Sequence, residues 1–92
     1  MDNHITEARE IPKSPLYVVA TDNFMSNWGH ARGCDNVLIF TADCATTAYR
    51  LEFKLNSRNE MRRVRINMSK PRIKPHWYAQ LFTPETHPAW YE

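Results

Sequence analysis

The chain has few of the residues that mark common catalytic or membrane-bound classes of protein. It contains only two glycines and two cysteines among 92 residues. No glycine-rich phosphate loop, G-x-S-x-G motif or H-E-x-x-H motif occurs in it. No run reaches the roughly 18–20 apolar residues of a membrane-spanning helix. The polar, acidic residues 1–15 do not have the pattern of a signal peptide, so we expect a cytoplasmic protein with no membrane association.

The potential metal ligands are also sparse. Cys34 and Cys44 could pair, but two free, partly buried thiols are expected in a reducing compartment. His30 is close to Cys34 in sequence, but no second ligand pair follows at the spacing of a zinc site. The acids are scattered and suggest no acid/base couple. The sequence therefore predicts no metal, no cofactor and no enzymatic activity, and leaves a small enzyme as a third hypothesis.

Positive charge is concentrated in one part of the chain. The window from Lys54 to Lys74 holds eight of the twelve basic residues and one of the ten acids, so it carries +7 while the rest carries −5. Such a polarised chain favours a polyanion or an acidic protein as partner. The candidate binding residues in the window are Arg58, Arg62, Arg63, Arg65, Lys70, Arg72 and Lys74.

The apolar residues predict a β-β-α-β-β order. The second strand has four consecutive apolar residues, which indicates a central position with both faces buried. One helix on a small, mostly antiparallel four-stranded sheet is an α+β fold. We expect a single domain over 1–92, with an extended or loosely attached arm at 1–15, a body at 16–82 and a tail at 83–92. Within the body, strands are expected at 16–20, 36–41, 61–68 and 76–82, and a helix at 44–55.

The predicted helix is amphipathic. Asp43 has the character of an N-cap. Tyr49 and Phe53 are expected to widen the apolar face. That face consists of Cys44, Ala48, Leu51 and Leu55.

The third strand places apolar and basic residues in alternation. Val64, Ile66 and Met68 are expected to face the core. Arg63 and Arg65 then share the other face, roughly 6.5–7 Å apart. Guanidinium groups at this spacing suit phosphate oxygens. A second interpretation is a solvated face, with some arginines paired to nearby acids.

The basic surface continues into the proline-punctuated segment 70–75, which is expected to be extended because proline fixes φ and removes a donor. Trp77 and Tyr78, which follow it, are predicted as anchors that stack on bases or on a partner's surface. Trp28 is a third predicted anchor. It lies in the loop 22–35, which either fills a small core over one end of the sheet or offers Trp28, His30 and Arg32 to a partner. The terminal aromatic pair, Trp90 and Tyr91, is expected to tuck against the body.

Four strings of sequence resemble a recurrent family of small phage and prophage proteins. They are YVVATDNFMSNWGHARGCDNVLIF at 17–40, NSRNEMRRVRI at 56–66, KPR at 70–72 and HPAWY at 87–91. The chain departs from the family pattern at Cys34, where a lysine is common, and its helix is less acidic, which argues against DNA mimicry. Small phage proteins of this type also resemble anti-CRISPR proteins, in particular inhibitors of type I-F systems.

The resemblance implies a protein that binds the host Cas surveillance complex, made of Cas proteins and guide RNA, and excludes target DNA. It would act in the host cytoplasm and be a monomer when free. The arginine strand would then meet guide-RNA phosphates or acidic Cas surfaces. The alternative is an independent phage regulatory protein that binds RNA or single-stranded nucleic acid directly.

Overall fold

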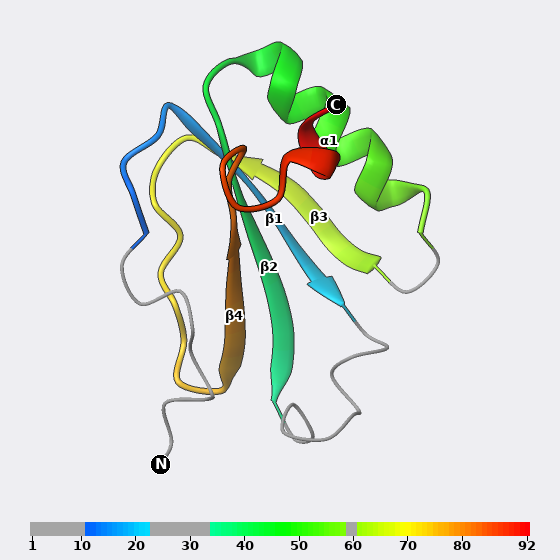
Figure 1. The fold of residues 1–92 in the computed structure, drawn as a ribbon. Helices are drawn as coiled ribbons and strands as arrows, with labels where there is room; N and C mark the ends of the chain where they lie inside the picture. Colours follow the sequence, from blue (N-terminus) through cyan, green and yellow to red (C-terminus); the bar gives the residue numbers. More distant parts are fainter. Residues whose placement is uncertain (1–10, 23–33, 59–60) are drawn as a thin grey trace.

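The computed structural model describes residues 11–22, 34–58 and 61–92, which form a four-stranded sheet with one α-helix (Figure 1). The sheet and helix follow the expected β-β-α-β-β order, and a short 3-10 helix, η4, ends the chain. The elements are β1 (Leu16–Asp22), β2 (Asp35–Ala42), α1 (Ala45–Asn56), β3 (Met61–Asn67), β4 (Trp77–Phe82) and η4 (Pro88–Tyr91).

The strands lie in the order β3-β1-β2-β4. β1 pairs antiparallel with both β2 and β3, whereas β4 lies parallel to β2. The mostly antiparallel α+β sheet is therefore confirmed. The central position of β2 is also confirmed, because every residue of this strand after Asp35 is buried. A parallel neighbour requires a crossover, and residues 68–76 supply it by running from the end of β3 to the start of β4, at the opposite edge of the sheet (Figure 1).

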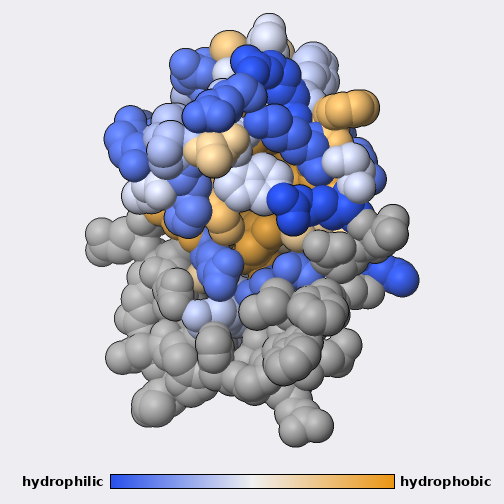
Figure 2. Space-filling model, turned by 45° about the vertical axis from the view of Figure 1, so that its right-hand side comes forward, coloured by the Kyte–Doolittle hydropathy of each residue, from blue (hydrophilic) through white to orange (hydrophobic). Residues whose placement is uncertain are grey.

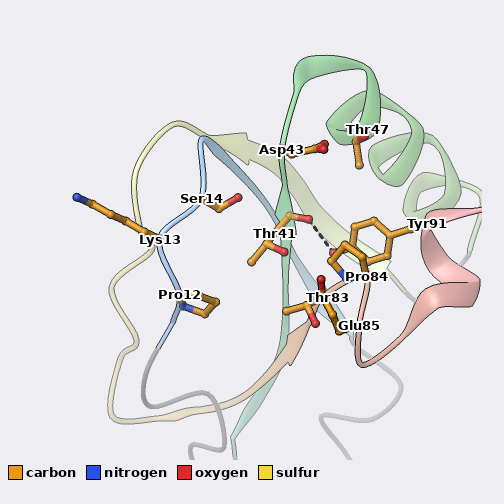
Figure 3. Close-up of a pocket in the computed structure, with 10 residues that line it drawn as sticks. All are labelled: Pro12, Lys13, Ser14, Thr41, Asp43, Thr47, Thr83, Pro84, Glu85 and Tyr91. Atoms are coloured by element: carbon orange, nitrogen blue, oxygen red, sulfur yellow. Dashed lines mark hydrogen bonds between the residues drawn. The ribbon is translucent and has the colours of Figure 1, made fainter.

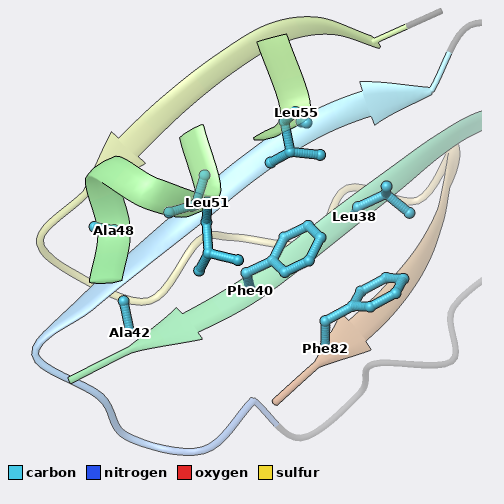
Figure 4. Close-up of a cluster of buried hydrophobic side chains, with 9 residues drawn as sticks. Leu38, Phe40, Ala42, Ala48, Leu51, Leu55 and Phe82 are labelled. Atoms are coloured by element: carbon cyan, nitrogen blue, oxygen red, sulfur yellow. The ribbon is translucent and has the colours of Figure 1, made fainter. Parts of the chain in front are cut away.

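The main core lies between α1 and one face of the sheet (Figure 4). Ala48, Leu51 and Leu55 point from the helix onto Phe40, which stacks on Phe82 with ring centroids 4.5 Å apart. The predicted helical spacing is thus confirmed for these three residues, whereas Cys44, which was predicted on the same apolar face, is exposed.

Two details of the helix differ from the prediction. Tyr49 and Phe53 are 62% and 75% exposed, so they do not widen the apolar face. At 3.6 residues per turn they lie about 130° and 170° from the centre of the buried stripe. The N-cap is Cys44 rather than Asp43, because Cys44 O accepts the first helical hydrogen bond, from Ala48 N at 3.1 Å. Cys44 makes no side-chain capping bond.

A second apolar cluster fills the opposite face of the sheet. It contains Val19 and Ile39 from the two central strands and Trp77 from β4, and Ile73 of the crossover packs against it. Ile11 of the N-terminal segment is also part of this cluster. Both faces of the sheet are therefore covered, which explains how a chain this short buries all of β2 after Asp35.

The N-terminal arm is attached to the sheet where the structure describes it, at residues 11–15. The Tyr17 hydroxyl donates to Pro12 O at 2.7 Å and accepts from Ser14 N at 2.9 Å. Ser14 Oγ donates to Ala42 O at 2.9 Å. Residues 1–10 of the predicted arm lie outside the described residues.

The C-terminal tail closes one end of the main core. Trp90 packs edge-on against Phe40 with ring centroids 5.0 Å apart. The Tyr91 hydroxyl donates to Thr41 O at 2.7 Å and lies 3.0 Å from Phe82 O. The predicted tucking of this aromatic pair is confirmed.

Candidate polyanion-binding surface

The edge strand β3 carries three exposed arginines. Val64 and Ile66 pack against the main core, while Arg62, Arg63 and Arg65 are exposed. These partly buried apolar residues anchor the strand backbone from which the arginines project. The predicted strand, with an apolar and a basic side, is therefore present over Met61–Asn67. The prediction that Met68 faces the core is wrong, because it follows the last residue of the strand and is 84% exposed.

A β-bulge changes which arginines share a face. Arg65 pairs with Val19, but Arg62, three residues earlier, pairs with Thr21, so β3 contains one extra residue. Arg63 lies at this bulge with a φ of 56°. Cross-strand partners face the same side of a sheet, so Arg62 and Arg65 share the face opposite α1. The prediction that Arg63 and Arg65 share one face is wrong, because Arg62 takes the place of Arg63. The partners of Arg62 and Arg65 are two residues apart on β1, so the two arginines are still about 6.5–7 Å apart along the strand.

A small hollow lies beside these arginines. Its volume is about 200 Å³, and Thr21, Asp35, Arg62 and Arg63 line it. A liquid water molecule takes about 30 Å³, so a phosphate group could enter. Asp35 would oppose such an anion, but its Oδ2 also lies 3.4 Å from His76 Nε2.

The other basic residues of the window lie elsewhere. Lys70, Arg72 and Lys74 are exposed on the crossover. Lys74 lies next to β4, with its Nζ 5.9 Å from the centre of the Trp77 ring. The two edge strands are three strand spacings apart, about 14 Å. The crossover therefore carries positive charge from the β3 edge toward the β4 edge, and the single compact basic face that was predicted is divided.

Two cations at the start of the window hold the C-terminus. Lys54 Nζ donates to Trp90 O and Glu92 O, each at 2.8 Å. The Arg58 guanidinium lies 4.7 Å from the centre of the Trp90 ring, in cation–π contact. Arg58 was predicted to bind a partner, but in this structure it contacts the protein's own tail.

Two of the three predicted aromatic anchors, Trp77 and Tyr78, are not available as surface groups. Trp77 and Tyr78 are 8% and 5% exposed because β4 lies beside the central strand with both faces of the sheet covered. This corrects the prediction that their rings stack on a partner. Trp28, with the rest of loop 23–33, lies outside the described residues. Among the residues that the structure describes, the exposed large apolar ones are instead Tyr49, Phe53 and Met68, and a helical-wheel projection would have identified the first two.

A larger cavity lies away from β3, at the carboxyl ends of β2 and β4 (Figure 3). Its volume is about 470 Å³. The Ser14 and Tyr91 hydroxyls donate to backbone carbonyls there, so their lone pairs remain as acceptors. Asp43 and Glu85 add carboxylates, whereas the Lys13 side chain points away from the cavity in Figure 3. A wall of acceptor oxygens does not suit a phosphate, so this cavity does not compete with β3 for a polyanion.

Burial affects one titratable group at this cavity. It raises the pKa of the Tyr91 hydroxyl above its ordinary value, and a nearby Glu85 carboxylate acts in the same direction. The hydrogen bond to Thr41 opposes the rise. The phenol therefore stays a donor across the neutral range.

Cys34 and Cys44 are free thiols; Cys34 is partly buried as predicted, but Cys44 is exposed. Over 11–22, 34–58 and 61–92, no group of three histidine, cysteine or acidic residues is placed to hold a metal ion. Nor does that part of the chain contain a helix long and apolar enough to cross a membrane. Comparison of the chain with family models, curated proteins and solved structures finds no match.

Proposed function

We propose that the protein binds a nucleoprotein complex through the arginines of β3 and thereby excludes other nucleic acid from it. The observation that carries the proposal is the exposed pair Arg62 and Arg65, held on one face by a strand whose apolar side packs into the core. Their separation is comparable with that of successive phosphates along a single strand. Because the strand is part of the folded sheet, little backbone entropy remains to be lost on binding.

The partner that we propose is a CRISPR surveillance complex of type I-F, to which the resemblance to anti-CRISPR proteins points. Guide-RNA phosphates or acidic protein side chains would accept bidentate hydrogen bonds from the guanidinium groups. Lys70, Arg72 and Lys74 would contribute longer-range attraction from the crossover. The protein would act in stoichiometric amounts in the host cytoplasm.

The test combines a pull-down with a DNA-binding assay. The purified surveillance complex should retain the protein and lose affinity for its target DNA. The double variant Arg62→Glu/Arg65→Glu should lower retention at least tenfold. The matched control Lys13→Glu/Arg50→Glu makes the same change in net charge at exposed sites outside β3 and should bind as the unmodified protein does. If both variants bound equally well, the β3 arginines would be a solvated face with no role in binding.

Direct binding of free RNA or single-stranded DNA is the second candidate function, because the same arginine pair would serve it. An empty pull-down, together with salt-dependent binding of an oligonucleotide, would favour it. For two phosphate contacts, removal of both arginines should reduce the slope of log K against log salt by about 1.4.

A further inference from the structure

The outer edge of β3 has no neighbouring strand in the described part of the chain. β3 ends the strand order and pairs only with β1. Edge strands expose backbone donors and acceptors that can pair with another extended chain. The bulge distorts β3 near Arg63, but Val64–Asn67 follows without proline or a further register shift. This half of β3 is therefore a regular, unpaired edge.

An apolar groove runs alongside this half of β3, between the strand and α1. Its volume is about 260 Å³, and mostly apolar side chains line it. Met68 and Tyr49, at its rim, are 84% and 62% exposed. Figure 2 turns the side of the molecule that carries α1 and β3 toward the viewer, and apolar surface is visible there among hydrophilic side chains. The lining consists of Leu16, Ala45, Ala48, Tyr49, Ile66 and Met68.

We propose that an extended segment of a partner protein, with alternating acidic and apolar residues, adds to β3 as a fifth strand. Side chains alternate between the faces of a sheet, and those of adjacent strands lie side by side. Acidic residues of the added strand would lie beside Arg62 and Arg65. The apolar residues between them would face the α1 side, next to Ile66 and the groove. Backbone hydrogen bonds supply affinity in such strand addition, and the side-chain pockets supply specificity.

Charge decides among the possible occupants. A second copy of this chain, paired through β3, would bring the arginines of two copies together, and like charges on adjacent strands are destabilising. A nucleic acid would satisfy the arginines but would leave the strand edge and the groove unused. An acidic strand matches all three features. The inference rests on the proposed function only in its use of Arg62 and Arg65.

The test uses a synthetic peptide as the probe. It is an acetylated, amidated heptapeptide of alternating valine and glutamate, titrated into the full 92-residue protein and followed by amide NMR shifts. We expect saturable shifts concentrated at Val64–Met68. A lysine-for-glutamate peptide should bind at least tenfold more weakly. A peptide N-methylated at alternate residues, which cannot complete the strand pairing, should lose binding to a similar extent.

A matched pair of variants tests the groove. Met68→Glu places a charge at the groove rim and should weaken peptide binding about tenfold, whereas Phe53→Glu alters an exposed side chain outside the groove and should not. Both residues are largely exposed, so neither change should unfold the protein. Equal binding of the N-methylated peptide, no effect of Met68→Glu, or concentration-dependent dimerisation through β3 would each overturn the inference.

The outcomes also separate this inference from the proposed function. If Met68→Glu leaves peptide binding unchanged while reversal of the β3 arginines abolishes retention by the surveillance complex, strand addition is wrong and the proposed function stands. If the peptide binds as expected while neither the surveillance complex nor free oligonucleotide does, the proposed function is wrong and strand addition stands.

Discussion

Replacement of Trp90 tests whether the C-terminal tail is part of the core. The indole contacts Phe40 and Phe82 with ring centroids 5.0 and 6.2 Å apart, and the Arg58 guanidinium covers it at 4.7 Å. The backbone carbonyl of Trp90 accepts a hydrogen bond from Lys54. Trp90 therefore connects η4 to β2 and β4 through its side chain and to α1 through its backbone carbonyl. Its loss should be felt by the whole domain rather than by the tail alone.

The size of the effect follows from burial. A fully buried tryptophan replaced by alanine costs about 3–5 kcal/mol of unfolding free energy. Trp90 is only half-buried, so about 2–3 kcal/mol is expected for Trp90→Ala. A domain of this length has a total stability of roughly 5–14 kcal/mol. At about 4–8 °C per kcal/mol, the melting temperature should fall by about 8–24 °C.

The measurement is thermal and urea unfolding followed by circular dichroism, with Phe53→Ala as the matched control. Phe53 is also an aromatic residue next to the basic window, but it is 75% exposed, and its loss should change stability by less than about 0.5 kcal/mol. Equal changes in the two variants would refute the assignment of the tail to the core. A Trp90→Ala effect below about 0.5 kcal/mol would do the same.

Three further changes should have smaller effects. Tyr91→Phe removes the donor to Thr41 O and should cost about 1–2 kcal/mol of unfolding free energy at neutral pH. Because burial raises the pKa of Tyr91 in the folded state, the stabilisation by the phenol is complete below about pH 10 and is lost as the pH rises further. The difference in unfolding free energy between the two proteins, measured in urea, should therefore narrow at high pH. Cys44→Ser supplies a capping hydroxyl to α1 and should raise the unfolding free energy by about 0.5–1 kcal/mol, whereas a neutral or negative result would show that the hydroxyl cannot reach the first turn. Arg63→Gly relieves a positive φ and should stabilise by up to about 1 kcal/mol, while Arg63→Val should destabilise; the opposite order in urea unfolding would contradict the left-handed backbone at the bulge.

The sequence predicted those features of the fold that depend on periodicity. The spacing of Ala48, Leu51 and Leu55 identified the buried side of α1, and the run at 37–40 identified the central strand. Each of these signals is local, because one face of the element must be apolar wherever the core lies. Asp43 was chosen as N-cap on propensity, yet the helix begins one residue later, where the chain has left β2.

The predictions that were wrong concern features that depend on strand pairing. The bulge at Arg63 exists only in relation to the register with β1, and the sequence of β3 alone does not specify it. The burial of Trp77 and Tyr78 follows from the parallel docking of β4 against β2, which the crossover makes possible. The sequence shows that Trp77 and Tyr78 are close to the basic window, but it does not show whether their rings are buried or exposed. The candidate basic residues could be found because the charge density of the window is visible in the sequence. Their distribution between the β3 edge and the crossover toward β4 depends on the strand order, which the sequence does not show.

The arginines of β3 also have a protective explanation, which experiment can separate from binding. Charged residues and bulges on edge strands prevent unwanted pairing, and β3 has both. Protection depends on the amount of charge, because either sign keeps copies of the chain apart, whereas binding of a polyanion or an acidic strand depends on its sign. The variant Arg62→Glu/Arg65→Glu should therefore remain soluble and monomeric while it loses its partner. Arg62→Thr/Arg65→Thr should lose both properties, with self-association at high concentration. If the glutamate variant retained its partner, protection alone would account for these arginines.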